Sequence, residues 1–186
     1  DIAVVRAVKP AVGDGVHLMS DYDQALSVPD AVHRVRALAD EGLYWIEEPC
    51  LAHDYQGYAR VRAASRCPIQ MGENWWGPEE MATSLGFGAS DLGMPDAMKI
   101  GGVSGWMQAA ALADSAGMPI STHLFPEVSM HLMAATPTRH WLEFVDWASP
   151  ILARPMEIRN GKASIPDAPG TGIEWDEAAV SRCLVH

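Results

Sequence analysis

The strongest constraint on the fold is a steady alternation of short apolar runs with longer segments in which apolar residues recur every three or four positions. Such runs are typical of buried strands, and the three- and four-residue spacing is typical of helices. The predicted strands are residues 16–20, 43–46, 68–72, 91–94, 118–122 and 141–145, and the helices between them are residues 29–41, 55–65, 78–85, 104–116 and 127–135. This repetition predicts right-handed βαβ units and a parallel sheet, so residues 1–150 are expected to form most of an α/β, TIM-type (β/α) barrel.

The pattern changes after about residue 150. Residues 158–165 alternate in polarity around the dipeptide Asn160-Gly161, which favours a tight hairpin turn. A short helix is predicted near residues 176–184. We therefore expect residues 151–186 to form a C-terminal hairpin and helix in a different layer from the repeats.

Charge and cysteine content narrow the partners and the compartment. The net charge of -11 makes nucleic acid and membrane surfaces poor partners, because both are anionic. No run approaches the roughly 20 apolar residues of a membrane span. Three cysteines without metal-finger spacing indicate a reducing cytoplasm. The first residue is Asp1, and residues 2–12 open in an amphipathic stretch, so we expect the C-terminal part of a longer protein.

Three acidic residues follow successive predicted strands in phase. Asp21, Glu47 and Glu73 stand 26 residues apart, which is one βα unit. The carboxyl ends of parallel barrel strands meet at one mouth, so these side chains are expected to converge there. One such acid could equally be a helix cap or a loop residue. Three together would repel one another, and this predicts a bound hard cation, Mg²⁺ first and Mn²⁺ second.

His123 ends the fifth predicted strand, and Asp96 follows the fourth. A carboxylate on one imidazole nitrogen fixes the tautomer and leaves the other nitrogen free to take a proton. A lone histidine at a strand end is otherwise a satisfied polar group, and Lys99 could instead pair with one of the acids. We favour the catalytic interpretation of His123 with Asp96. Trp75 and Trp76 could line the cavity or pack the loop.

Several motifs carry a resemblance to a known family. They are Asp21-Tyr22-Asp23-Gln24, Trp45-Ile46-Glu47-Glu48-Pro49, Met71-Gly72-Glu73-Asn74-Trp75, Met94-Pro95-Asp96-Ala97-Met98-Lys99-Ile100-Gly101-Gly102, Ser121-Thr122-His123-Leu124-Phe125, and Ala135-Thr136-Pro137 through His140-Trp141-Leu142-Glu143. Over nearly the whole chain the sequence resembles the barrel domain of the mandelate racemase/muconate lactonizing enzyme family, in the enolase superfamily.

The resemblance implies a role for each motif. It implies that Asp21, Glu47 and Glu73 bind Mg²⁺, which in turn binds the substrate carboxylate. It makes His123 with Asp96 one acid/base catalyst and Glu143 an acid that donates a hydrogen bond to the same carboxylate. Asp23 occupies the substrate-binding position at which mandelate racemase has an asparagine.

The resemblance also concerns parts that the sequence does not contain. The family's opposite base, the second lysine of a Lys-x-Lys motif, and its N-terminal α+β capping domain would lie before Asp1. The C-terminal segment would return to that capping domain. The family further implies a homo-oligomer.

The sequence therefore predicts a Mg²⁺-dependent racemase that abstracts the α-proton of a mandelate-like 2-hydroxy carboxylate through a metal-stabilised enediolate. The first alternative is an acid-sugar dehydratase, in which the enediolate expels a β-hydroxyl with His123 as general acid. The alternative from another class is a metal-binding barrel remnant without turnover.

Overall fold

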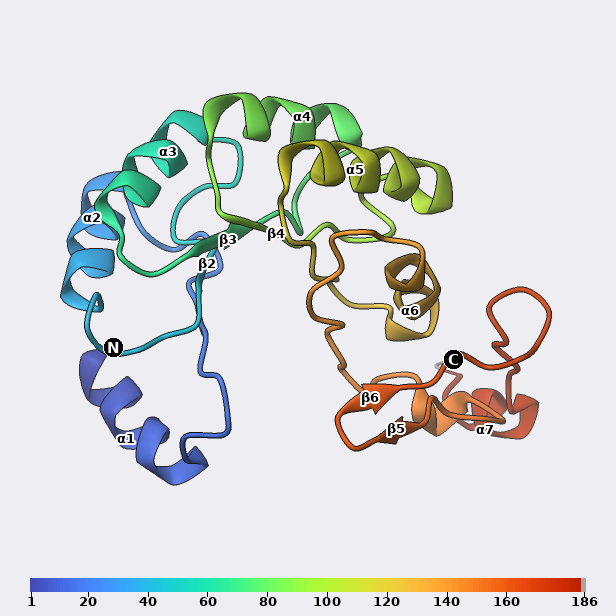
Figure 1. The fold of residues 1–186 in the computed structure, drawn as a ribbon. Coiled ribbons are helices and arrows are strands. Elements are labelled where there is room, and N and C mark those ends of the chain that lie inside the picture. The colour runs from blue at the N-terminus through green and yellow to red at the C-terminus, as the bar shows by residue number, and fades with distance from the viewer. Residues whose placement is uncertain (185–186) are drawn as a thin grey trace.

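A computed structural model describes residues 1–184 of the chain. The order of elements is α1 (Ile2–Val12), β1 (Ser20–Asp21), α2 (Val28–Ala37), β2 (Ile46–Glu47), α3 (Tyr55–Ala64), β3 (Ile69–Met71), α4 (Pro78–Phe87), β4 (Leu92–Gly93), α5 (Gly102–Ala116), α6 (Pro126–Ala134), the 3₁₀ helix η1 (Ser149–Ile151), β5 (Ile158–Arg159), β6 (Lys162–Ala163) and α7 (Glu177–Arg182). Helices α2 to α5 form an outer arc around the strands (Figure 1). The predicted α/β barrel architecture is confirmed.

The strands pair in parallel in the order β1-β2-β3-β4. The predicted strands at residues 118–122 and 141–145 do not appear as regular strands. Single parallel bridges continue the order instead, from Gly93 to Ile120 and from Ile120 to Arg139. Backbone hydrogen bonds still join these segments, among them those donated by the Ser121 amide to Gly93 and by the Thr122 amide to Trp141.

Local sequence signals account for most helix ends. Ser27 caps α2 by accepting a hydrogen bond from the amide of Asp30, and Pro29 lies in the first turn as predicted. Gly117 ends α5 in the left-handed conformation, with φ 63°. The predicted helix at residues 29–41 is too long, because α2 ends at Ala37 and turns follow it.

Apolar side chains from the helices pack against the outward side of the strands. Ile46, Ile69, Met71 and Ile120 are almost completely buried in this core. No helix within residues 1–184 is both long enough and apolar enough to cross a membrane.

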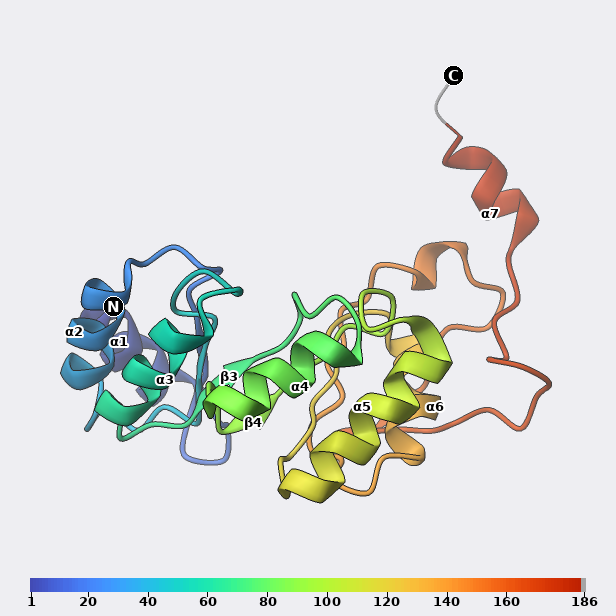
Figure 2. The same ribbon diagram turned by 90° about the horizontal axis from the view of Figure 1, so that it is seen from above.

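The C-terminal segment forms its own small sheet, as predicted. β5 and β6 pair antiparallel around Asn160 and Gly161, whose φ angles of 51° and 70° are those of a tight hairpin turn. α7 confirms the predicted last helix and extends away from the barrel-like body (Figure 2). Residues 185 and 186 of this segment lie outside the described residues. Its docking onto a capping domain stays a prediction.

Candidate functional site

The three predicted metal carboxylates come from the ends of β1, β2 and β3. Asp21 and Glu47 are direct partners in the parallel register, and Glu73 follows β3 by two residues. All three line one cavity of about 410 Å³ at the carboxyl ends of the strands. Within residues 1–184, however, no three Asp, Glu, His or Cys side chains already enclose a metal-sized point.

One carboxylate oxygen of Glu47 accepts hydrogen bonds from two neighbouring side chains. Its Oε2 accepts hydrogen bonds from Trp45 Nε1 at 2.9 Å and from Gln70 Nε2 at 3.1 Å. Burial, together with the charges of Asp21 and Glu73, raises the pKa of Glu47 to about 7 despite these two hydrogen bonds, which lower it. Sequence reasoning missed Trp45, although it lies two residues before Glu47 and so shares its face of the strand.

Glu73 enters the cavity because Gly72 turns the chain at the end of β3. Gly72 has a φ of 139°, and a Cβ there would come within 2.7 Å of the Trp75 ring and 2.9 Å of the Met94 amide nitrogen. Only glycine fits this close approach. Trp75 is buried and packs the loop, whereas Trp76 is largely exposed.

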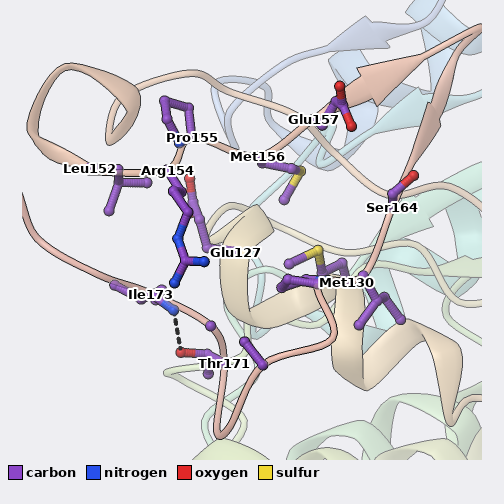
Figure 3. A pocket seen from close by; sticks show the side chains of 14 residues that line it. Glu127, Met130, Leu152, Arg154, Pro155, Met156, Glu157, Ser164, Thr171 and Ile173 are labelled. Carbon is purple, nitrogen blue, oxygen red and sulfur yellow. Dashed lines mark hydrogen bonds between the residues drawn. The ribbon is translucent and has the colours of Figure 1, made fainter.

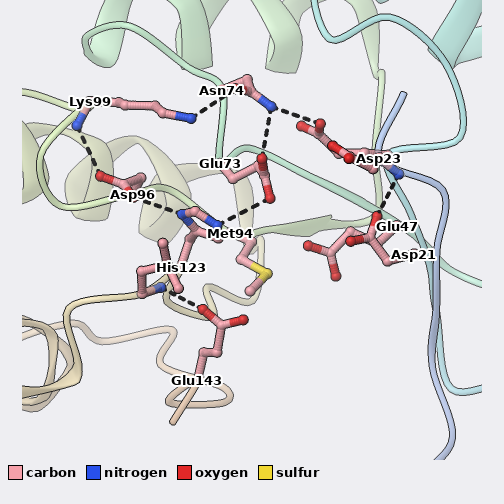
Figure 4. A network of polar contacts seen from close by, with 12 residues as sticks. Asp21, Asp23, Glu47, Glu73, Asn74, Met94, Asp96, Lys99, His123 and Glu143 are labelled. Atoms are coloured by element: carbon pink, nitrogen blue, oxygen red, sulfur yellow. Dashed lines mark hydrogen bonds and ion pairs between the residues drawn. The ribbon is translucent and has the colours of Figure 1, made fainter. Parts of the chain in front are cut away.

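His123 and Asp96 form the predicted pair. His123 Nδ1 lies 2.7 Å from Asp96 Oδ2, and its Nε2 lies 3.2 Å from Glu73 Oε2 (Figure 4). Burial alone would lower the pKa of His123, but the hydrogen bond to Asp96 and the charges of Glu73 and Glu143 outweigh it, so the pKa is raised. The backbone amides of Met98 and Lys99 donate to Asp96 Oδ1, which leaves Oδ2 for the imidazole.

Glu143 lines the same cavity and lies in residues 141–145, the sixth predicted strand. Its carboxylate accepts a hydrogen bond from the Leu124 amide, and its own amide donates to Thr122 Oγ1 at 3.0 Å. Asp23 is not among the residues that line the cavity, and its amide donates to Asp21 Oδ1 at 2.9 Å. The substrate-binding roles of Glu143 and Asp23 stay predictions.

A second polar network, which sequence reasoning missed, adjoins the carboxylates. Asn74 Nδ2 donates to Glu73 Oε1 at 3.0 Å and to Glu48 Oε2 at 2.8 Å, and Lys99 Nζ donates to Asn74 Oδ1 at 2.9 Å. Lys99 therefore binds an amide rather than an acid. Glu48 is only 1% exposed, and burial with the charge of Glu73 raises its pKa to about 7. The Glu-Glu-Pro motif was the available signal for Glu48.

Another cavity, of about 310 Å³, lies between α6 and the C-terminal segment (Figure 3). Met130, Leu152 and Met156 form part of its lining. Arg154 lines it as well, but its guanidinium is paired with Glu174 at 2.7 Å. Its lining within residues 1–184 includes Glu127 and Glu157 but no imidazole, so we assign the chemistry to the first cavity.

The donor set at the strand ends fits a hard divalent cation. Asp21, Glu47 and Glu73 offer only oxygen, and burial makes the ionised form of Glu47 costly without a nearby positive charge. The two neutral donors on Glu47 leave its Oε1 available. These residues could hold Mg²⁺, and their assignment as its ligands stays a prediction.

A family model described as enolase C-terminal domain-like matches residues 1–179. The chain belongs to this family. It is 36% identical over 96% of its length to L-talarate/galactarate dehydratase of Salmonella typhimurium, of which it covers 45%. It is 32% identical over its whole length to 3,6-anhydro-alpha-L-galactonate cycloisomerase of Streptomyces coelicolor, of which it covers 52%.

Solved structures agree with this assignment. An enolase from Bradyrhizobium complexed with magnesium and mandelic acid has a TM-score of 0.93 and 42% identity, over 98% of this chain and 51% of that one. An enolase from an alphaproteobacterium with bound magnesium has a TM-score of 0.96 and 49% identity, over 100% of this chain and 52% of that one. The chain therefore spans about half the length of the relatives it matches. The relatives include dehydratases and cycloisomerases, and several of the similar structures, one of them a racemase from Streptomyces coelicolor, contain magnesium.

Proposed function

We propose that the protein dehydrates an acid sugar by removing the proton next to its carboxylate, in a Mg²⁺-dependent reaction. The observation that carries the proposal is the geometry of His123, whose Nδ1 is held by Asp96 while Nε2 points into the carboxylate-lined cavity. The sequence alone placed racemisation first. The reported relatives, which include a dehydratase of talarate and galactarate, favour dehydration instead.

One imidazole can complete this reaction. His123 Nε2 takes the α-proton, so the α C–H bond breaks and an enediolate forms. The imidazolium then returns that proton to the β-hydroxyl, the β C–O bond breaks, and water leaves. The resulting enol tautomerises to a 2-oxo-3-deoxy acid, and His123 is neutral again. Asp96 keeps Nδ1 protonated, so Nε2 is the nitrogen that accepts and donates.

We propose Asp21, Glu47 and Glu73 as the Mg²⁺ ligands. A bound divalent ion supplies electrostatic stabilisation of the negative charge that develops on the substrate carboxylate. Glu143 faces the same cavity as His123 and is proposed to donate a hydrogen bond to that carboxylate. Asp23 is proposed to contact the substrate on the ground of the family resemblance alone, because its side chain does not line the cavity and its amide donates to Asp21.

Racemisation of a mandelate-like acid is the second candidate. The 42% identical Bradyrhizobium structure contains mandelic acid. The cavity also has apolar walls at Trp45, Trp141 and Leu142, which suit an aromatic substituent. Racemisation needs a second base on the other face of the substrate, whereas dehydration by His123 alone does not.

The deciding experiment is proton NMR in D₂O of the full-length protein with Mg²⁺ and a panel of acid sugars and mandelate. Dehydration yields new signals at C3 of a 2-oxo-3-deoxy acid, and racemisation replaces the α-proton by deuterium without changing the skeleton. His123→Asn should slow dehydration by at least about 100-fold, and substitution of the exposed His33 by Asn should leave the rate unchanged. A protein that binds Mg²⁺ but converts none of these acids would be a non-catalytic metal-binding barrel.

We further propose that the protein works on small carboxylates as a cytoplasmic homo-oligomer. The three cysteines of residues 1–184 are all free thiols, which suits a reducing compartment. The acidic charge of -11 disfavours nucleic acid and anionic lipid as partners.

A further inference from the structure

Lys99 contacts three separate parts of the site. Its amide donates to Asp96 Oδ1 at 3.0 Å, its carbonyl accepts from the Gly77 amide at 3.1 Å, and its Nζ donates to Asn74 Oδ1 at 2.9 Å. One residue on the loop after β4 is thus bonded to both ends of the loop that follows Glu73. The same residue is bonded to the carboxylate that holds the catalytic imidazole.

The contact with Lys99 decides how the Asn74 amide points. A lysine ammonium has donors only, so it must face the amide oxygen. The amide nitrogen is thereby directed at the two carboxylates, with Glu73 Oε1 at 3.0 Å and Glu48 Oε2 at 2.8 Å (Figure 4). Glu73 Oε2, the remaining oxygen, points toward His123 and the cavity.

Glu48 adds a reason why this amide must stay in place. It is 1% exposed, and its Oε1 has no hydrogen-bond partner in the described part of the chain. Asn74 is therefore its side-chain donor. A rotated amide would set its oxygen against two carboxylates, and buried oxygens facing one another without a donor are costly.

We propose that Lys99 is a positioning residue that couples the metal side of the site to the base side. Acting through Asn74, its side chain fixes Glu73 for the ion, while its amide fixes Asp96 for His123. This inference rests on the proposed function, because it assumes that Glu73 is a ligand and His123 the base. Outer residues that orient metal ligands typically change metal affinity or activity by about 10- to 100-fold when they are replaced.

The test compares Lys99→Met with Lys162→Met, which makes the same change at an exposed hairpin position. Mg²⁺ affinity is measured by isothermal titration calorimetry on the full-length protein, with kcat and Tm measured on the same samples. Lys99→Met is expected to weaken Mg²⁺ binding and to lower kcat by about 10-fold or more each. Lys162→Met is expected to change neither.

Asn74→Ala provides a second variant for the same link. It should weaken Mg²⁺ binding as Lys99→Met does, and the double variant should be no weaker than Asn74→Ala alone, because both act through one amide. A purely structural Lys99 would lower Tm and leave Mg²⁺ affinity unchanged. Wild-type affinity in folded Lys99→Met, or in folded Asn74→Ala, overturns the proposal.

The outcomes also separate this inference from the proposed reaction. Unchanged Mg²⁺ affinity in the variants, with acid-sugar turnover by the wild type, contradicts the coupling role alone. Weakened affinity in the variants, with no turnover by the wild type, contradicts the reaction alone and leaves the coupling in place.

Discussion

The two sides of the cavity are built in different ways. The carboxylates on one side stand at the ends of β1, β2 and β3, which pair in a continuous parallel register. The base side, residues 118–145, has single bridges in place of regular strands. There His123 is held by a backbone bridge to Asp96 and by the hydrogen bond between their side chains, and Glu143 by hydrogen bonds with Thr122 and the Leu124 amide.

This difference separates two kinds of defect. A substitution among the proposed metal ligands should lower Mg²⁺ affinity and turnover together, because turnover depends on the bound ion. A change on the base side should remove turnover and leave Mg²⁺ affinity nearly intact.

Glu47→Gln should lower kcat by at least about 10⁴-fold, because several kcal/mol of electrostatic stabilisation depend on the ion. Mg²⁺ affinity should fall with it, measured by calorimetry. The fold should persist, since a buried carboxylate with a pKa of about 7 is replaced by a neutral isostere. A variant that unfolds at room temperature would mean that Glu47 is structural.

His123→Asn should lower kcat by about 10²- to 10⁴-fold, the usual contribution of one general acid/base. Mg²⁺ affinity should stay within about threefold of wild type, by the same calorimetry, because His123 is not a proposed ligand. If affinity fell as far as in Glu47→Gln, the two sides would not be separable.

Asp96→Asn should lower kcat by about 10- to 100-fold through loss of the hydrogen bond that fixes the His123 tautomer. The ionised Asp96 also raises the pKa of His123, so the pH–rate profile should shift to lower pH in the variant. An unshifted profile, recorded between pH 5 and 9, would show that Asp96 does not act through the imidazole.

The smallest effect concerns stability without metal. The pKa of Glu48 is about 7 in the folded chain, against roughly 4.3 when unfolded. Between these two pH values the folded state therefore binds more protons than the unfolded state. The contribution of Glu48 to the free energy of unfolding should be largest below about pH 4.3 and should fall as the pH rises toward 7.

Glu48→Gln should consequently raise the Tm of metal-free protein at pH 8 by several degrees and change it little at pH 4. Thermal melts in EDTA at the two pH values provide the measurement. A Tm that drops equally at both would mean that the Asn74 hydrogen bond, and not the buried charge, dominates.

The sequence predicted the parts of the fold that rest on local patterns. Five helices and the parallel pairing of β1 to β4 were predictable from the apolar spacing. The start of α2 near Pro29 and the end of α5 at Gly117 were predictable from the backbone conformations that these two residues favour. The prediction of regular strands near residues 118–122 and 141–145 was wrong. Whether an apolar run is assigned as a regular strand depends on its pairing with neighbours that are distant in sequence.

The candidate site divides in a similar way. Asp21, Glu47 and Glu73 could be found because strand ends converge, and His123 with Asp96 because their segments are neighbours. The hydrogen bond from Lys99 to Asn74 could not be predicted, because it joins two loops that are distant in sequence and produces no periodic pattern of residues.

The most direct test of the account is a crystal structure of the full-length protein with Mn²⁺ in place of Mg²⁺, located by anomalous scattering. We expect one ion at the strand ends, with one oxygen each from Asp21, Glu47 and Glu73 at roughly 2.0–2.3 Å. His123 Nε2 should face the space beside that ion, with Asp96 still on Nδ1. An ion bound elsewhere, or bound without two of these three carboxylates, would contradict the central claim.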